Sequence, residues 1–384
     1  MYEVYEKFLS TLRNSGKYRR LAQFRQESNS ELLDFSTNDY LNLSQNRDII
    51  EAGEIAAQEY GIGSTGSRLL SGNCKLFEEF EDAISKDKKT ESSLIFCSGF
   101  QANISALSCI LDDKVLNAKP LVFFDKLNHS SLYQAVFLSK AELKRYRHND
   151  INHLESLLEE CKNDPSPKFI VTETVFGMDG DIAPLDEIIK LAEKFNAFLY
   201  LDEAHATGVF GQDGYGLSTT LDFQNVPHII MGTFSKAIGV SGAYVACNKI
   251  VRDFIINKAT GFIYSTAPSP SVIGAAFKAW KLIKSLDKER QDLQKLGNLL
   301  RTMLKDRGFN IGTSETHIIP IILYKEEKCL KVQKALLQKG IIISSIRPPT
   351  VPPNTCRLRI ALTIKHTQKD LKRFVETLSM VVES

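Results

Sequence analysis

The chain has 384 residues, of which 43% are hydrophobic and 24% charged, and its formal net charge is +2. This length is sufficient for two hydrophobic cores, and the nearly balanced charge gives no argument for a nucleic-acid-binding protein. No hydrophobic run reaches the ~18 residues needed to span a bilayer. Residues 1–6 lack the basic and hydrophobic regions of a secretory signal, so we expect a cytoplasmic protein. The seven cysteines form no C-x-x-C pair, which favours reduced structural thiols over disulfides or a metal site.

Residues 1–45 contain a charged helix and the segment Phe35–Tyr40, which we expect to pack with a smaller domain or to bridge two domains. From residue 46 to 270, helical patterns alternate with short runs that are hydrophobic throughout. Such runs are typical of strands covered on both faces, and the helices between them indicate a mainly parallel sheet. The predicted strands are Leu94–Cys97, Leu121–Asp125, Phe169–Thr172, Ala197–Asp202, Ile229–Gly232 and Ala243–Cys247.

The last third of the chain has a different pattern. Val272–Leu304 predicts one long helical stretch that is broken only weakly. Shorter strands and amphipathic helices follow: Ile318–Leu323, Lys328–Lys339, Ile341–Ser344, Arg357–Leu362 and Gln368–Val382. We therefore predict an α/β protein with an N-terminal segment (1–45), a large domain (46–270) and a small C-terminal α/β domain (271–384).

The run Gly61-Ile62-Gly63-Ser64-Thr65-Gly66 fits the dinucleotide-binding pattern G-x-G-x-x-G. That turn has to follow a strand and open a helix. Here the preceding segment, Asp48–Tyr60, is helical by pattern, and a loop follows. An NAD-dependent dehydrogenase is therefore a disfavoured alternative, and the glycines indicate a loop or a close backbone approach.

Lys236 and Asp202 give the main indication of which chemistry the protein performs. Asp202 ends one predicted strand and Lys236 follows the next, so both lie at carboxyl ends of strands, where open α/β sheets place their ligands. A pyridoxal phosphate (PLP) enzyme needs this pair: the lysine forms a Schiff base and the aspartate keeps the pyridine nitrogen protonated. From pattern alone, a surface lysine and an aspartate that caps a helix remain open.

Further polar residues follow the same strand ends. His205 lies three residues after Asp202, and His129 follows another predicted strand; each also fits a structural histidine. Ser98, Gly99 and Phe100 begin a predicted helix, whose free N–H groups suit a phosphate. Thr233 and Ser235 could add hydroxyl contacts to it. Alternation places Arg357 and Arg359 on one strand face, where an arginine could bind a carboxylate or simply face solvent.

These residues together resemble the α-oxoamine synthases, PLP enzymes of fold type I that condense an amino acid with an acyl thioester and release CO2. The resemblance covers nearly the whole chain. Its motifs are Phe35–Leu41, Gly63–Asn73, Ser98–Asn103, Asn128–Ser131, Glu173 with Met178–Asp181, Asp202–Gly208, Thr233–Ala237 and Arg357–Arg359.

The resemblance implies a role for each matched residue. Lys236 would hold PLP, Asp202 would pair with its ring nitrogen, His205 would contact its phenolic oxygen and His129 would stack on its ring. Asn38 and Arg359 would hold the carboxylate of the amino acid. The segment Ser265–Thr266 resembles one that reaches the phosphate from a neighbouring subunit, which implies a homodimer with shared sites.

Two further details of the resemblance concern the substrate and the hydrogen bonds to PLP. Gly16–Arg20 resembles a segment of the family branch that joins L-alanine to a pimeloyl thioester on coenzyme A or an acyl carrier protein, so Arg20 is a predicted substrate contact. Gly177 stands where the family often has serine, which implies one hydrogen bond fewer to PLP, worth ~1 kcal/mol. Glycine C-acetyltransferase, 5-aminolevulinate synthase, serine palmitoyltransferase and a non-catalytic synthase subunit remain open alternatives.

Overall fold

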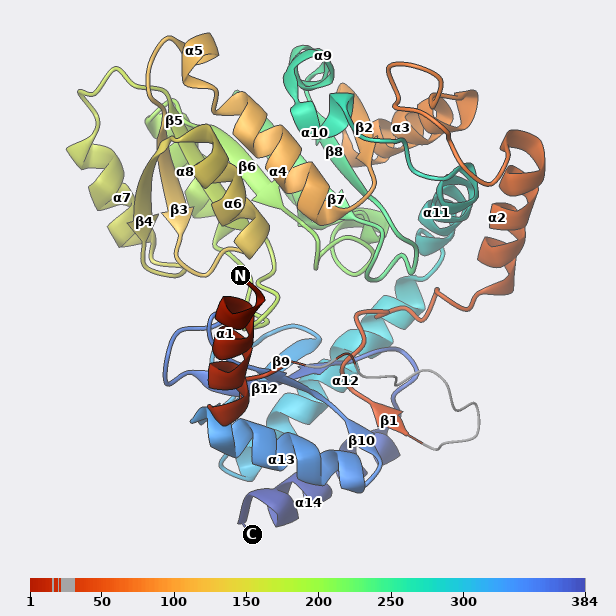
Figure 1. The fold of residues 1–384 in the computed structure, drawn as a ribbon, viewed down its shortest axis with the longest axis vertical. Coiled ribbons are helices and arrows are strands. Elements are labelled where there is room, and N and C mark those ends of the chain that lie inside the picture. Colours follow the sequence, from red (N-terminus) through yellow and green to blue (C-terminus); the bar gives the residue numbers. More distant parts are fainter. Residues whose placement is uncertain (16, 20, 22–31, 384) are drawn as a thin grey trace.

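The computed structural model describes residues 1–15, 17–19, 21 and 32–383. Figure 1 shows two layered parts, an upper one built on a large sheet and a lower one built on small sheets and helices. α11 (Pro270–Ile283) and α12 (Asp287–Asp306) run between them. None of the helices in the described ranges is long and apolar enough to cross a membrane.

The upper part contains a seven-stranded sheet in the order β2-β8-β7-β6-β5-β3-β4. Every strand is parallel to the others except β8, so the prediction of a mainly parallel sheet is confirmed. All six predicted strands are present within two residues at each end. β4 is an additional strand. The bounds are β2 (Ser92–Phe96), β3 (Leu121–Asp125), β4 (Glu142–Tyr146), β5 (Lys168–Glu173), β6 (Phe198–Asp202), β7 (His228–Thr233) and β8 (Ala243–Cys247).

Helices cover both faces of this sheet, because alternate side chains of each buried strand point to opposite faces. One face buries Val171, Tyr200 and Ile229 beneath α4 (Gly99–Ile110), α6 (Ser130–Ser139), α9 (Lys249–Lys258) and α10 (Thr260–Ile263). These helices lie in front of the sheet in Figure 1. The other face buries Ile170, Leu201 and Ile230 beneath α3 (Lys75–Lys88), α7 (Ile151–Glu160) and α8 (Leu185–Lys194).

The lower part has a three-stranded antiparallel sheet in the order β11-β12-β9. A short parallel pair joins β1 of the N-terminal segment to β10. Its elements are β1 (Leu33–Asp34), β9 (Ile318–Tyr324), β10 (Ile341–Ile342), β11 (Ser344–Ile346), β12 (Cys356–Ala361), α13 (Glu326–Gln338) and α14 (Gln368–Glu383). We keep the division into 1–45, 46–270 and 271–384 as a proposal.

The weakly broken helical stretch predicted over Val272–Leu304 consists of two helices, because residues 284–286 separate α11 from α12. The buried guanidinium of Arg290 lies at this break, where its Nη1 donates to the carbonyl oxygen of Ile283, 2.5 Å away. A side chain of the second helix thus satisfies a terminal carbonyl of the first, which stabilises the break. α11 then packs against α2 (Arg47–Tyr60).

Three ionisable side chains join β3, the segment after β4 and the turn after β5. His148 contacts Asp125 through Nδ1, 3.0 Å from Oδ1, and Asp181 through Nε2, 2.9 Å from Oδ2. Burial acts to lower the pKa of His148, but the hydrogen bonds and charges of the two aspartates outweigh it and raise the pKa to about 10. The folded protein therefore favours the protonated imidazole.

We predict that His148→Gln removes a pH-dependent share of the stability. Because the folded pKa lies above the ordinary value of 6.5, the contribution is complete below pH 6.5 and is lost as pH rises toward 10. The free energy of unfolding of the variant should be lower by a few kcal/mol (order of magnitude) at pH 6.5, with the difference shrinking toward pH 10. Denaturant unfolding at several pH values measures this, with His153→Gln on α7 as the control. A difference that does not change with pH would contradict the assignment.

Candidate active site

A cavity of about 240 Å³ lies at the carboxyl ends of β5, β6 and β7. Nine predicted site residues line it: Ser98, Gly99, Phe100, His129, Asp202, His205, Thr233, Ser235 and Lys236. Asn103, Ser131, Glu173, Ala204 and Met231 complete the lining. The parallel strands end at the same edge of the sheet, so residues far apart in sequence meet there.

Asp202 ends β6 and is buried, with 3% of its surface exposed. Its Oδ2 accepts a hydrogen bond from Asn103 Nδ2 at 2.8 Å, and its Oδ1 accepts one from the backbone N–H of Ala204 at 2.9 Å. The Tyr200 hydroxyl donates to Oδ1 of Asn103 at 2.9 Å and so fixes the orientation of the amide. Residues 204–209 form turns, so Asp202 does not cap a helix here. Our site assignment missed Asn103, although its spacing in the motif Ser98–Asn103 could have identified it.

Lys236 follows β7 and is partly buried at the cavity. Burial lowers the pKa of Lys236, and the charges of Asp202 and Glu173 offset part of this effect. Glu173 ends β5, and burial together with the charge of Asp202 raises its pKa. Lys236 therefore loses its proton more readily than an exposed lysine, and Glu173 keeps its proton more readily than an exposed glutamate. Both lie next to the carboxylate of Asp202.

His129 precedes α6 and accepts a hydrogen bond from the backbone N–H of Ser131 through Nδ1, at 3.3 Å. The same nitrogen lies 2.8 Å from the Ser131 hydroxyl, which accepts from Asn103 Nδ2. Burial lowers the pKa of His129, which favours a neutral imidazole. The network connects His129 to Asp202 through Ser131 and Asn103.

The first turn of α4 forms another part of the cavity wall. Ser98 is the N-cap residue, and its hydroxyl accepts from the backbone N–H of Gln101 at 3.2 Å. The hydroxyls of Thr233 and Ser235 are 2.8 Å apart, and a Cβ on Gly99 would lie 3.7 Å from the Thr233 side chain. Helix N–H groups and two hydroxyls therefore converge, as an anion-binding site requires.

Asn38 and Arg359 come together from the two ends of the chain. Nη1 of Arg359 donates to Oδ1 of Asn38 at 3.0 Å, and Nη2 donates to the Tyr40 hydroxyl at 3.4 Å. That hydroxyl is 2.7 Å from Nδ1 of His205, so the arginine is connected to the cavity wall. Arg357 lies in the same strand but binds Asp179. Our site assignment did not include Tyr40, because nothing in the sequence indicates its contact with a residue 165 positions away.

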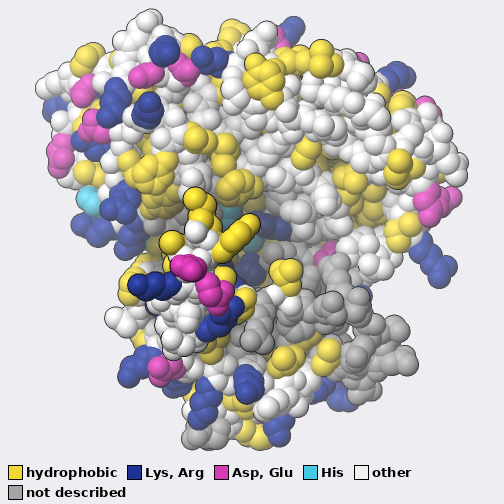
Figure 2. Space-filling model, in the orientation of Figure 1, with side chains coloured by type: hydrophobic (Ala, Val, Ile, Leu, Met, Phe, Trp, Pro, Cys, Tyr) yellow, Lys and Arg dark blue, Asp and Glu magenta, His cyan; other side chains and the backbone are white. Residues whose placement is uncertain are grey.

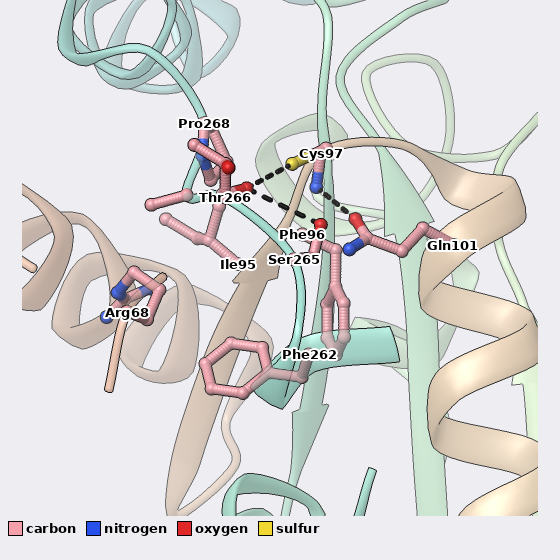
Figure 3. Close-up of a pocket in the computed structure, with 10 residues that line it drawn as sticks. Arg68, Ile95, Phe96, Cys97, Gln101, Phe262, Ser265, Thr266 and Pro268 are labelled. Carbon is pink, nitrogen blue, oxygen red and sulfur yellow. Dashed lines mark hydrogen bonds between the residues drawn. The ribbon is translucent and has the colours of Figure 1, made fainter. Parts of the chain in front are cut away.

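Thr266 does not line this cavity. It lies at a smaller hollow next to Cys97, whose Sγ is 3.4 Å from the Thr266 carbonyl oxygen (Figure 3). Gln101 accepts from the Cys97 backbone N–H at 2.7 Å, and so links this hollow to the first turn of α4. Thr266 is exposed. Arg20 lies outside the described residues.

Comparisons with known proteins agree with this geometry. The family model for aminotransferase class I and II matches residues 30–378. A protein from Paramagnetospirillum magneticum, named "Putative 8-amino-7-oxononanoate synthase", is 46% identical over 354 residues, which cover 92% of this chain and 89% of the relative. A protein of the same name from Bacillus thuringiensis subsp. konkukian is 41% identical over 383 residues, covering 98% and 95%.

Solved structures give the same picture. A serine palmitoyltransferase from S. paucimobilis with bound PLP has a TM-score of 0.90 and 26% identity, covering all of this chain and 97% of the other. The 8-amino-7-oxononanoate synthase from Francisella tularensis has a TM-score of 0.79 and 27% identity, covering 92% and 98%. The chain therefore belongs to the aminotransferase class I and II family, and within it to the α-oxoamine synthases that its motifs indicated.

Proposed function

We propose that this enzyme uses PLP to condense L-alanine with a pimeloyl thioester, on coenzyme A or an acyl carrier protein, yielding 8-amino-7-oxononanoate, CO2 and the free thiol. Such an enzyme would act in biotin biosynthesis. The observation that carries the proposal is the meeting of Lys236, Asp202 and His129 in one cavity, next to the pair Asn38 and Arg359. The names of the relatives at 41–46% identity support the choice of alanine and pimelate.

The residues of the cavity fit PLP. Asp202 offers a buried carboxylate to the ring nitrogen, held in place by two donors. The first turn of α4, with Thr233 and Ser235, offers N–H and hydroxyl donors to the phosphate. His129 offers a flat neutral imidazole to the ring face, and His205 a second imidazole to the phenolic oxygen. When bound, PLP supplies an electron sink for the α-carbon of the amino acid.

Lys236 is the proton-transfer group of the proposed reaction. Burial makes its amine lose a proton more easily than an exposed lysine does, and an unprotonated amine can remove the α-proton of the substrate. Asp202 limits how far the pKa falls, so the amine can also return a proton after CO2 leaves. The acyl group joins the α-carbon as the carbon–sulfur bond of the thioester breaks, and the thiolate takes a proton from solvent. Loss of CO2 breaks the bond between the α-carbon and the carboxylate, and the proton held by Lys236 takes its place on the α-carbon, which gives the aminoketone.

Arg359 and Asn38 are the proposed carboxylate site. Nη1 and Nη2 of Arg359 point to Asn38 and Tyr40 and are the donors that a substrate carboxylate would engage as a pair. Its Nε donates to the Gly177 carbonyl oxygen, which fixes the plane of the guanidinium. This leaves the outer edge of the group for the substrate.

A second candidate is another α-oxoamine synthase: glycine C-acetyltransferase, 5-aminolevulinate synthase or serine palmitoyltransferase. The TM-score of 0.90 with a serine palmitoyltransferase favours keeping it, although identity is higher with the 8-amino-7-oxononanoate synthase relatives. Two other classes have less support. Gly61 ends a helix instead of following a strand, which disfavours an NAD-dependent dehydrogenase. A complete set of cavity residues disfavours a non-catalytic subunit.

We also propose that two copies of the chain share their active sites. Bridges and hydrogen bonds join the loop 61–72 to residues 264–269, as between Ser67 and Thr266. This region exposes large hydrophobic side chains: Ile62, Leu69, Leu70 and Tyr264. The helix α1 (Tyr2–Asn14) has no buried residue and exposes Tyr2, Val4 and Phe8. Figure 2 shows hydrophobic side chains gathered over this helix. Exposed apolar area of this kind is typical of a protein interface.

We expect L-alanine with a pimeloyl thioester to give the fastest thiol release. The test mixes the PLP-loaded protein with alanine, glycine or serine and with pimeloyl, acetyl, succinyl and palmitoyl thioesters of coenzyme A, and with pimeloyl acyl carrier protein. Thiol and CO2 should appear in equal amounts. Serine with palmitoyl-CoA, or glycine with a short acyl group, giving faster release than alanine would replace the first candidate by the second.

Lys236→Ala should lower turnover ~10²–10⁴-fold, because a positioned base contributes about that much. The variant should still bind PLP non-covalently through Asp202 and the phosphate site, which the absorbance of the dialysed protein measures. Lys295→Ala, on the exposed side of α12, is the matched control. Near-normal turnover in Lys236→Ala would remove the proposed role.

Shared sites predict recovery of activity on mixing two inactive variants. Lys236→Ala removes the base. Thr266→Glu places a negative charge where the phosphate of PLP in the neighbouring subunit would bind. Random exchange yields half hybrid dimers, each with one intact site, so activity should return to about a quarter of the wild-type value. Light scattering should give twice the chain mass of 43.1 kDa. A dimer whose mixed variants recover nothing would contradict sharing.

A further inference from the structure

Gly177 lies in the turn after β5, and His205 fills the space that a side chain would need there. A Cβ built on Gly177 would lie 2.3 Å from Nε2 and 2.8 Å from Cδ2 of His205. Atoms do not approach this closely, so the observed position of the imidazole requires a residue without a Cβ. The backbone of Gly177 is not in the left-handed region, so the requirement is one of space and not of backbone conformation.

The turn itself is held on both sides of this residue. The backbone N–H of Gly177 donates to Oε2 of Glu173 at 3.4 Å, and its carbonyl oxygen accepts from Nε of Arg359. Gly180, three residues on, accepts from the Thr316 hydroxyl at 2.8 Å. The turn therefore has little freedom to move away from an added methyl group, whereas the imidazole is attached by one bond to its own chain and can rotate.

His205 is fixed from its other side by Tyr40. Nδ1 of His205 lies 2.7 Å from the Tyr40 hydroxyl, which also donates to Oδ1 of Asn38 at 3.1 Å. The contact with Nδ1 is the shorter of the two, and either partner can be its donor. Burial, with the charges of Lys236 and Arg359, lowers the pKa of His205, in keeping with a neutral ring with one N–H.

These contacts form a closed ring of four residues. Gly177 binds Arg359 through its carbonyl, Arg359 binds Tyr40, Tyr40 binds His205, and the His205 ring packs on Gly177. We propose that Gly177 is a positioning residue that keeps His205 hydrogen-bonded to Tyr40, and that it thereby couples the histidine facing the cofactor to the arginine of the amino-acid site. That the arginine binds an amino acid and that the histidine faces PLP rest on the proposed function. The contact between His205 and Tyr40 is independent of it.

The test on ligand binding is a double-mutant cycle of Gly177→Ala and Tyr40→Phe. The first change displaces the His205 ring, and the second removes its hydrogen-bond partner. Gly177→Ala loses the hydrogen bond between His205 and Tyr40, worth ~1 kcal/mol, and should weaken binding of L-alanine to the PLP-loaded protein about five-fold. Tyr40→Phe loses that bond together with the contacts to Asn38 and Arg359, and should weaken binding by at least as much. Calorimetry without thioester measures this. Because both act on one bond, the double variant should be no weaker than the poorer single variant. Losses that multiply, or an unchanged affinity in Gly177→Ala, would overturn the proposal.

A second measurement needs no substrate. In nitrogen-15 NMR of the histidine side chains, Tyr40→Phe should move the Nδ1 resonance of His205, and Gly177→Ala should move the same resonance in the same direction. The other histidines serve as internal controls for folding. A His205 resonance that keeps its wild-type position in Gly177→Ala overturns the proposal. If the wild-type protein binds no amino acid while the resonance moves as expected, the proposed function fails and the positioning role stands.

Discussion

Burial of the Asp202 carboxylate is the constraint on which the rest of the site depends. An uncompensated carboxylate in the interior costs several kcal/mol, so its partners have to be supplied by the fold. Asn103 arrives from α4, the Ala204 N–H from the turn after β6, and the positive charge of Lys236 from beyond β7. Because β7 pairs with β6, the strand order places the lysine by the carboxylate.

Glu203, the next residue, places a second buried carboxylate on the opposite side of the sheet. Glu203 is completely buried, and its carboxylate binds the ammonium of Lys88 from α3 and the backbone N–H of Ser218 at 2.7 Å. A Cβ on Gly216 would lie 2.3 Å from its Oε2, so the surrounding loop is packed onto this pair. Consecutive carboxylates at the end of β6 are thus anchored on opposite faces, which restrains the direction in which Asp202 points.

The sequence predicted the strands that are buried on both faces, because hydrophobic runs such as Leu121–Asp125 have no other place in the fold. It did not predict β4 (Glu142–Tyr146), an edge strand whose charged side chains are tolerated where one side is open to solvent. The cavity residues next to strand ends were predictable for the same reason as the strands. Tyr40 was not, because its role depends on contacts with His205 and Arg359, which only tertiary packing creates.

The turn of residues 174–182 links the upper and lower parts of the molecule through direct contacts. It leaves the large sheet at β5, yet it binds both arginines of β12: Arg357 through Asp179 and Arg359 through the Gly177 carbonyl. A Cβ on Gly180 would lie 1.8 Å from the carbonyl oxygen of Ile318, so β9 is packed directly on the turn. The guanidinium at the proposed carboxylate site is therefore oriented by the large sheet, although its backbone belongs to the small one. A shift of the lower part relative to the upper would act on Arg359 through this turn, which makes the amino-acid site sensitive to how the two parts meet.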